Sequence, residues 1–138
     1  MSVILIVEDE DQVRVLAESV LRDAGYEVLA ATALEGTQAL LKSDQLIDLL
    51  FVDVNLGGDL EAGLRIALNA RERRPSLPVV YTSGQAVDDG KKALFAEPYL
   101  FLPKPYTSEQ LISSIAYLLN RNGGSRSSPD LPSLAQSI

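Results

Sequence analysis

The sequence contains no cysteine and no histidine. Without cysteine, the chain can form no disulfide, zinc thiolate or thiol nucleophile. Without histidine, it can build no Ser-His-Asp triad and can carry no phosphohistidine of its own. No apolar run approaches the ~18 residues of a membrane span, and the N-terminal residues are no secretory signal. These absences predict a reduced, cytoplasmic protein.

Positive charge is also scarce. The 138 residues include 12 Lys and Arg against 19 Asp and Glu, which gives a formal net charge of -7. This balance argues against direct binding to nucleic acid or to an anionic membrane. The length suits one domain with a substantial core. We therefore expect a single acidic globular domain.

Short apolar runs alternate with segments of helical periodicity. The runs are expected to be strands, over Val3–Val7, Tyr26–Ala31, Leu49–Asp53, Pro78–Thr82 and Tyr99–Leu102. The segments after them are expected to be helices, among them Leu34–Lys42 and a third helix marked by Leu60, Leu64, Ala67 and Leu68. The segment from Gln85 to Leu94 is expected to be a weak, polar helix. The last helix is expected to begin with a capping box, given by the spacing of Thr107 and Gln110. This order predicts an α/β fold, flavodoxin-like and doubly wound: a five-stranded parallel sheet, order 2-1-3-4-5, with helices on both faces.

The composition changes near the C-terminus. Residues 123–129 are rich in Gly and Ser, and the remainder to Ile138 carries few large apolar side chains. Such composition is typical of linkers and is too poor in apolar residues to fold alone. We expect a domain over residues 1–122 and a flexible tail or linker over residues 123–138.

Polar residues follow four of the expected strands. Glu8 and Asp9 follow the first, Asp53 ends the third, Thr82 ends the fourth, and Lys104 follows the fifth. The carboxyl ends of parallel strands meet at one edge of a sheet, where α/β folds place their chemistry. Taken singly, these residues have ordinary explanations, such as a loop cap at Asp53 or favourable charge before a helix at Glu8 and Asp9.

Together, these residues suit phosphoryl uptake. Three crowded carboxylates repel one another unless a cation is present, and Mg²⁺ or Mn²⁺ suits such oxygen ligands. Lys104 would add a fixed positive charge, and Thr82 a hydroxyl donor. A carboxylate surrounded in this way, here Asp53, can attack a phosphoryl group while its neighbours neutralise the phosphoryl oxygens.

Four motifs, in this order and at this spacing, resemble the receiver domain of two-component response regulators, the family of the bacterial chemotaxis regulator. The resemblance spans Val3 to about Arg121. The motifs are Val7-Glu8-Asp9-Glu10-Asp11, Phe51-Val52-Asp53-Val54-Asn55, Tyr81-Thr82-Ser83-Gly84 and Phe101-Leu102-Pro103-Lys104-Pro105-Tyr106.

The resemblance implies a role for each matched position. Asp53 would be the phosphoacceptor, and Lys104 would contact the phosphoryl group. The metal, Mg²⁺ or Mn²⁺, would be bound by Glu8, Asp9, Asp53 and the main-chain carbonyl of Asn55. Thr82 would be the switch hydroxyl and Phe101 the switch aromatic, and the Lys104–Pro105 bond would be cis. Two of these positions depart from the common pattern, since Glu8 stands where Asp is usual and Phe101 where Tyr is commoner.

The expected function is that of a single-domain response regulator. It would accept a phosphoryl group from a histidine kinase or histidine phosphotransfer protein, with no enzymatic activity beyond self-catalysed transfer and autodephosphorylation. It would then dock a downstream protein on the face formed by the fourth helix, the fifth strand and the last helix. The alternative is a receiver excised from a larger regulator or hybrid kinase.

Other functions fit the sequence less well. A haloacid-dehalogenase-type phosphatase needs a second Asp as general acid, and Asn55 stands there instead. A phosphate-binding loop would need four residues between its glycines and a hydroxyl residue after the lysine, which the stretch 84–92 lacks. A flavodoxin-like electron carrier would not place four carboxylates after the first strand. A degenerate receiver that only docks is disfavoured because every reactive position is filled.

Overall fold

The computed structural model describes residues 1–87, 89–92, 94–95 and 97–123. Its strands are β1 (Val3–Val7), β2 (Glu27–Ala31), β3 (Leu49–Asp53), β4 (Val79–Ser83) and β5 (Tyr99–Pro103). Its helices are α1 (Asp11–Asp23), α2 (Leu34–Lys42), α3 (Ala62–Arg73), α4 (Asp89–Lys92) and α5 (Ser108–Gly123). Nearly all of the predicted tail, residues 124–138, lies outside the described residues.

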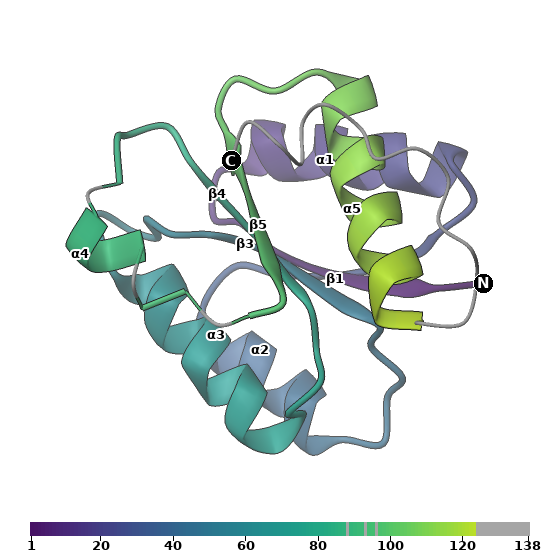
Figure 1. Ribbon diagram of the computed structural model, residues 1–138, viewed down its shortest axis with the longest axis horizontal. Helices are drawn as coiled ribbons and strands as arrows, with labels where there is room; N and C mark the ends of the chain where they lie inside the picture. The colour runs from purple at the N-terminus through teal and green to yellow at the C-terminus, as the bar shows by residue number, and fades with distance from the viewer. Residues whose placement is uncertain (88, 93, 96, 124–138) are drawn as a thin grey trace.

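The five strands form one parallel sheet in the order β2-β1-β3-β4-β5, as predicted (Figure 1). Helices α2 and α3 cover one face, and α1 and α5 cover the other (Figure 1). The register sets Val7 of β1 opposite Val52 of β3, and Asp53 of β3 opposite Thr82 of β4. The carboxyl ends of these strands therefore lie side by side.

The core consists of two apolar layers, one on each face of the sheet. Every residue of β1, β3 and β4 is buried, which explains why these strands read as continuous apolar runs. Alternate strand residues point to opposite faces. The layer under α2 and α3 includes Leu5, Leu50, Val52, Leu41, Leu64 and Ala67, and the layer under α1 and α5 includes Ile4, Ile6, Phe51, Leu21, Leu111, Ile115 and Leu118.

The start of α5 confirms the capping box. The backbone N–H of Gln110 donates to Thr107 Oγ1 at 3.0 Å, and the N–H of Thr107 donates to Gln110 Oε1 at 2.9 Å. These bonds satisfy donors that the first turn of a helix otherwise leaves unpaired. The cap fixes where α5 begins, only a few residues after Lys104.

Two predictions about helices differ from the structure. The helix expected from Gln85 to Leu94 is reduced, within the described residues, to the four residues of α4, and 85–87 are not helical. Gly90 lies inside α4, and the segment supplies little apolar surface to hold a longer helix. In addition, Leu60 and Leu68 are exposed, so α3 is held by Leu64, Ile66, Ala67 and Ala70 instead.

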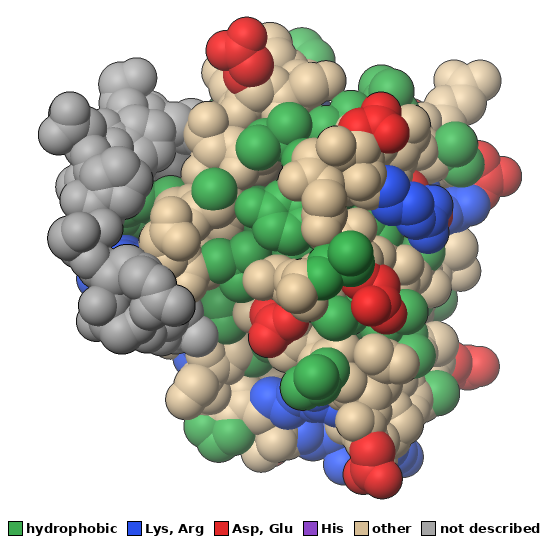
Figure 2. Space-filling view, turned by 90° about the vertical axis from the view of Figure 1, so that its right-hand side faces the viewer, with side chains coloured by type: hydrophobic (Ala, Val, Ile, Leu, Met, Phe, Trp, Pro, Cys, Tyr) green, Lys and Arg blue, Asp and Glu red, His purple; other side chains and the backbone are tan. Residues whose placement is uncertain are grey.

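The surface mixes charged and apolar side chains. On the face shown in Figure 2, acidic side chains are scattered among apolar and uncharged ones, and basic side chains lie toward its right and lower margins. In the described part of the chain, no helix combines the length and the apolar character needed to cross a membrane.

Candidate functional site

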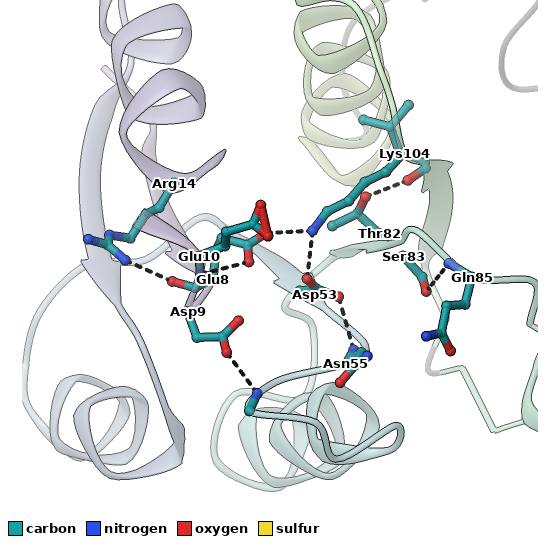
Figure 3. A network of polar contacts seen from close by, with 12 residues as sticks. Glu8, Asp9, Glu10, Arg14, Asp53, Asn55, Thr82, Ser83, Gln85 and Lys104 are labelled. Atoms are coloured by element: carbon teal, nitrogen blue, oxygen red, sulfur yellow. Dashed lines mark hydrogen bonds and ion pairs between the residues drawn. The ribbon is translucent and has the colours of Figure 1, made fainter. Parts of the chain in front are cut away.

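Three carboxylates meet at the carboxyl edge of the sheet. Glu8 and Asp9 follow β1, and Asp53 is the last residue of β3 (Figure 3). One carboxylate oxygen from each of the three lies within 4.8 Å of the other two. Glu8 and Asp53 are only 4% and 5% exposed, whereas Asp9 is exposed. The predicted acidic cluster is therefore present, and most of its charge is withdrawn from water.

Lys104 lies between two of these carboxylates. Its Nζ donates to Asp53 Oδ2 at 2.7 Å and to Glu8 Oε1 at 2.9 Å (Figure 3). Burial alone would lower the pKa of the Lys104 ammonium, but the hydrogen bonds to Asp53 and Glu8 outweigh it and raise the pKa. Lys104 therefore stays protonated and brings a permanent positive charge to Asp53.

Glu8 is held through both of its carboxylate oxygens. Oε1 accepts the bond from Lys104, and Oε2 accepts from the backbone N–H of Glu10 at 3.1 Å. Burial, followed by the negative charge of Asp53, raises the pKa of Glu8, although the bond from Lys104 opposes this rise. The side chain that is one methylene longer than the usual Asp thus reaches Lys104 directly.

The loop after β3 folds over the carboxylates. The backbone N–H of Asn55 donates to Asp53 Oδ1 at 2.9 Å, and the N–H of Gly57 donates to Asp9 Oδ2 at 2.8 Å. Gly57 and Gly58 both have positive φ, of 59° and 83°, a region that side chains rarely allow. These two glycines of the loop after β3 therefore shape one wall of the site.

The residues present suit a hard divalent cation. The carboxylates of Glu8, Asp9 and Asp53 line a cleft of about 420 Å³ together with Asn55 and Lys104. The side-chain oxygen Oδ1 of Asn55 is buried without a hydrogen-bond partner. Such an orphan acceptor beside three carboxylates is the oxygen-rich environment that Mg²⁺ and Mn²⁺ prefer. The donor set is therefore compatible with the predicted metal.

Thr82 lies beside Asp53 in the sheet, but its hydroxyl is engaged elsewhere. Thr82 Oγ1 donates to the carbonyl oxygen of Leu102 on β5 at 2.6 Å, and the residue is 1% exposed (Figure 3). To reach a group on Asp53, this hydroxyl would have to leave the β5 backbone. The contact ties β4 to β5 at the height of the site.

Phe101 belongs to a group of aromatic rings between β4, β5 and the segment after α4. The partly buried Phe101 stacks on Phe95 with ring centroids 6.1 Å apart, and Phe95 stacks on the fully buried Tyr81 at 4.0 Å. Tyr81 precedes Thr82 on β4. Phe101 is therefore connected by ring contacts to the neighbour of Thr82.

The peptide bond between Lys104 and Pro105 is cis, as predicted.

Two residues near the site were not singled out from the sequence. A Cβ on Gly63 of α3 would lie 2.1 Å from the carbonyl oxygen of Asp53, and the Gly63 N–H donates to the carbonyl of Val54 at 2.9 Å. A glycine inside a helical pattern was the signal in the sequence that could have identified Gly63.

Tyr106 is the second residue near the site that was not singled out. Burial, followed by the negative charge of Glu8, raises the pKa of its hydroxyl to about 12.

Comparisons with known proteins agree with this geometry. The family model for the response regulator receiver domain matches residues 4–116. The nitrogen assimilation regulatory protein NtrX of Azorhizobium caulinodans is 30% identical over 110 residues, which cover 79% of this chain and 24% of NtrX. The sensor kinase CckA of Brucella abortus is 30% identical over 122 residues, 86% of this chain and 12% of CckA.

Solved structures show the same likeness. The crystal structure of a response regulator receiver protein from Sinorhizobium medicae superposes with a TM-score of 0.80 and is 34% identical, covering 88% of this chain and 96% of that one. The match covers nearly the full length of that solved receiver. In contrast, the chain spans only about a quarter of the length of NtrX.

Proposed function

The chain belongs to the response regulator receiver domain family, and we propose that Asp53 is its phosphoacceptor. The observation that carries this proposal is the position of the Asp53 carboxylate. It is buried beside two other carboxylates and is hydrogen-bonded to the Lys104 ammonium at 2.7 Å. A carboxylate held in this way can act as the nucleophile, and the neighbouring ammonium can neutralise the negative charge of the phosphoryl group that it takes up.

In the proposed reaction, a carboxylate oxygen of Asp53 attacks the phosphorus of a phosphohistidine on the donor protein. The new O–P bond forms as the P–N bond breaks, and the electron pair leaves with the imidazole nitrogen. Lys104 then pairs with a phosphoryl oxygen, so it must exchange one of its present contacts, to Glu8 or to Asp53, for the new one. A Mg²⁺ or Mn²⁺ ion held by Glu8, Asp9, Asp53 and the main-chain carbonyl of Asn55 would supply further neutralising charge.

The donor is proposed to be a histidine kinase or a histidine phosphotransfer protein, because the chain has no histidine of its own. Two settings are compatible with the matches. One is a single-domain regulator. The other is a receiver within a larger protein, as in the sensor kinase of which the chain matches a small part. The cytoplasmic location and the division at residue 122 stay predictions.

Uptake of a phosphoryl group from a small acyl phosphate tests this proposal. Intact mass is expected to show one phosphoryl adduct with Mg²⁺ present, and peptide mapping should place it on Asp53. With a chelator present, the rate should fall by roughly 10²-fold, because several kcal/mol of charge neutralisation is lost. Full uptake in the presence of chelator, or an adduct at another residue, contradicts the proposal.

Replacing Lys104 by Arg should slow phosphoryl uptake by roughly 10-fold or more. The compact ammonium donates to two carboxylates at once, whereas the planar guanidinium is larger and has a fixed fork of donors. The comparison is the rate of adduct formation measured by mass. Lys42→Arg, at an exposed position on α2, is the matched control and should leave the rate unchanged. Equal rates of adduct formation for both variants would contradict a role for Lys104 in phosphoryl uptake.

We propose that phosphorylation is transmitted through Thr82 and Phe101 to the face formed by α4, β5 and α5. The Thr82 hydroxyl would leave the Leu102 carbonyl for the phosphoryl group, which frees space beside β5. Phe101 carries no polar atom, so further burial stabilises it by up to about 1.5–3 kcal/mol. Its contact with Phe95 would carry the change toward α4, the shortest helix.

Hydrogen exchange with and without a phosphoryl mimic tests this path. Amide protection is expected to change between Ser83 and Tyr106 and to stay constant in α2, on the opposite side of the sheet from α5. The residues of α4 whose exposure is described, Asp89, Gly90 and Lys92, are all exposed, so little buried surface resists local opening there. Unchanged protection from Ser83 to Tyr106 would leave Phe101 as a static core residue.

A further inference from the structure

The Arg14 guanidinium joins the end of β1 to the start of α1. Its Nη1 donates to the main-chain carbonyl of Glu8 at 3.1 Å (Figure 3). Its Nη2 donates to the carboxylate of Asp11 at 2.7 Å, and its Nε lies 3.5 Å from a carboxylate oxygen of Glu18, further along α1. The side chain of Arg14 is only 15% exposed. Arg14 therefore contacts the acidic pair of the site through the backbone.

The carbonyl that Arg14 holds belongs to the peptide unit between Glu8 and Asp9. This unit is planar, so a bond to its oxygen restrains the directions in which both residues leave it. The Glu8 side chain turns to Lys104, at 2.9 Å. The Asp9 carboxylate instead accepts the N–H of Gly57, at 2.8 Å. The orientation of one peptide unit thus decides whether both carboxylates face the cleft of the site, here called the acidic cleft.

This peptide unit lies just past the paired part of the sheet. The register of β1 with β2 and β3 ends at Val7. The N–H of Glu8 still donates to the carbonyl of Ala31 on β2, at 3.1 Å, but the carbonyl of Glu8 lies one step further on. Glu10, the N-cap residue of α1, makes no side-chain cap bond. A main-chain carbonyl withdrawn from water needs a donor, and Arg14 supplies it.

We propose that Arg14 is a positioning residue for the acidic cleft. By holding the peptide unit between Glu8 and Asp9, it fixes the two carboxylates in the directions from which they bind a divalent cation. A group of this kind acts through the metal ligands and does not touch the ion. The statement about the cation rests on the metal site proposed above, whereas the placement of Asp9 against Gly57 does not.

The sign of the effect separates positioning from simple charge. A guanidinium near the cleft repels a cation, so its removal would by itself strengthen cation binding. Loss of positioning would weaken the same binding. Arg14→Met keeps an apolar stem and removes both the charge and the donors. It leaves the buried residues of α1, Ala17 and Leu21, unchanged, so the variant should fold, and thermal unfolding checks this.

Binding of Mn²⁺ to the full chain, followed by the electron paramagnetic resonance signal of the free ion, is the first measurement. Arg14→Met should raise the Kd about 10-fold. Arg14→Gln, whose side chain ends short of the Glu8 carbonyl, should do the same. The matched control, Arg22→Met, removes a charge from the same helix and a contact to the same Glu18, but Arg22 bonds to the carbonyl of Val28 instead. Its Kd should equal that of the unmodified chain.

The amide NMR signal of Gly57 in the protein without added metal is the second measurement. Because this N–H donates to Asp9, its proton signal should move upfield in both Arg14 variants and stay in place in Arg22→Met. An unmoved Gly57 signal, or equal or tighter Mn²⁺ binding by the Arg14 variants, overturns the proposal and leaves phosphoryl uptake at Asp53 unaffected. If the unmodified chain binds no Mn²⁺, the proposed metal site and this inference are overturned together.

Discussion

The Asp53→Asn variant is expected to take up no phosphoryl group while keeping its fold. An amide oxygen is a far weaker nucleophile than a carboxylate, so the proposed O–P bond cannot form. The substitution keeps the shape of the side chain, and its oxygen can still accept the N–H of Asn55. Lys104 retains Glu8 as a partner. Intact mass after incubation with an acyl phosphate and Mg²⁺ measures the loss, and circular dichroism checks the fold.

Asp59→Asn is the matched control for this loss. Asp59 lies in the same loop after β3, but it is exposed and pairs with Arg65 rather than with Lys104. Its replacement should leave phosphoryl uptake at the level of the unmodified sequence. An adduct of similar yield on the Asp53→Asn variant would move the acceptor to Glu8 or Asp9 and would contradict the role proposed for Asp53.

The Gly63→Ala variant is expected to be strongly destabilised. The added Cβ would lie 2.1 Å from the carbonyl oxygen of Asp53 and 2.6 Å from the Cα of Val54, and both are backbone atoms that cannot swing away. The start of α3 must therefore move from the end of β3. Overpacking of this kind costs about 1–3 kcal/mol or more. A fall in Tm on the order of 5–15 °C is expected in thermal unfolding.

Replacing Gly36 by alanine should have the opposite effect and stabilise the protein. Gly36 lies inside α2, and a Cβ there would meet only the Cβ of Ala31, at an ordinary 3.5 Å. Alanine in a helix is favoured over glycine by roughly 0.5–1 kcal/mol, so Gly36→Ala should raise Tm. If both variants were neutral, the close approach of α3 to β3 would not constrain residue 63.

Much of the fold could be predicted because the sheet is parallel and covered on both faces. Strands such as Val3–Val7 are buried along their whole length, so they read as apolar runs whose ends are unambiguous. The extent of α4 could not be predicted in the same way. With little apolar surface in that segment, its length depends on tertiary contacts, such as those of Phe95, that local pattern does not show.

For the site, strand order alone was enough to predict which residues meet. Glu8, Asp9, Asp53 and Lys104 are brought together because each lies at the carboxyl end of a strand of one sheet or just after it. The spacing of the residues along the sequence could not predict which hydrogen bonds each side chain makes. The contact of Glu8 with Lys104 and the bond from Thr82 to the carbonyl of Leu102 both depend on side-chain conformation, which spacing along the chain does not determine. The roles assigned to these residues stay proposals until the variants are measured.

The stacked rings of Tyr81 and Phe95 also give this chain an optical probe. The sequence has no tryptophan and five tyrosines, so its near-ultraviolet spectrum is dominated by tyrosine. Tyr81 is fully buried and lies in fixed contact with Phe95, next to Thr82 in the chain. Rings held in one asymmetric environment give near-ultraviolet circular dichroism, which vanishes when packing loosens. Tyrosine ellipticity can therefore report on the packing around Tyr81, together with that of the other four tyrosines, with no label added to the protein.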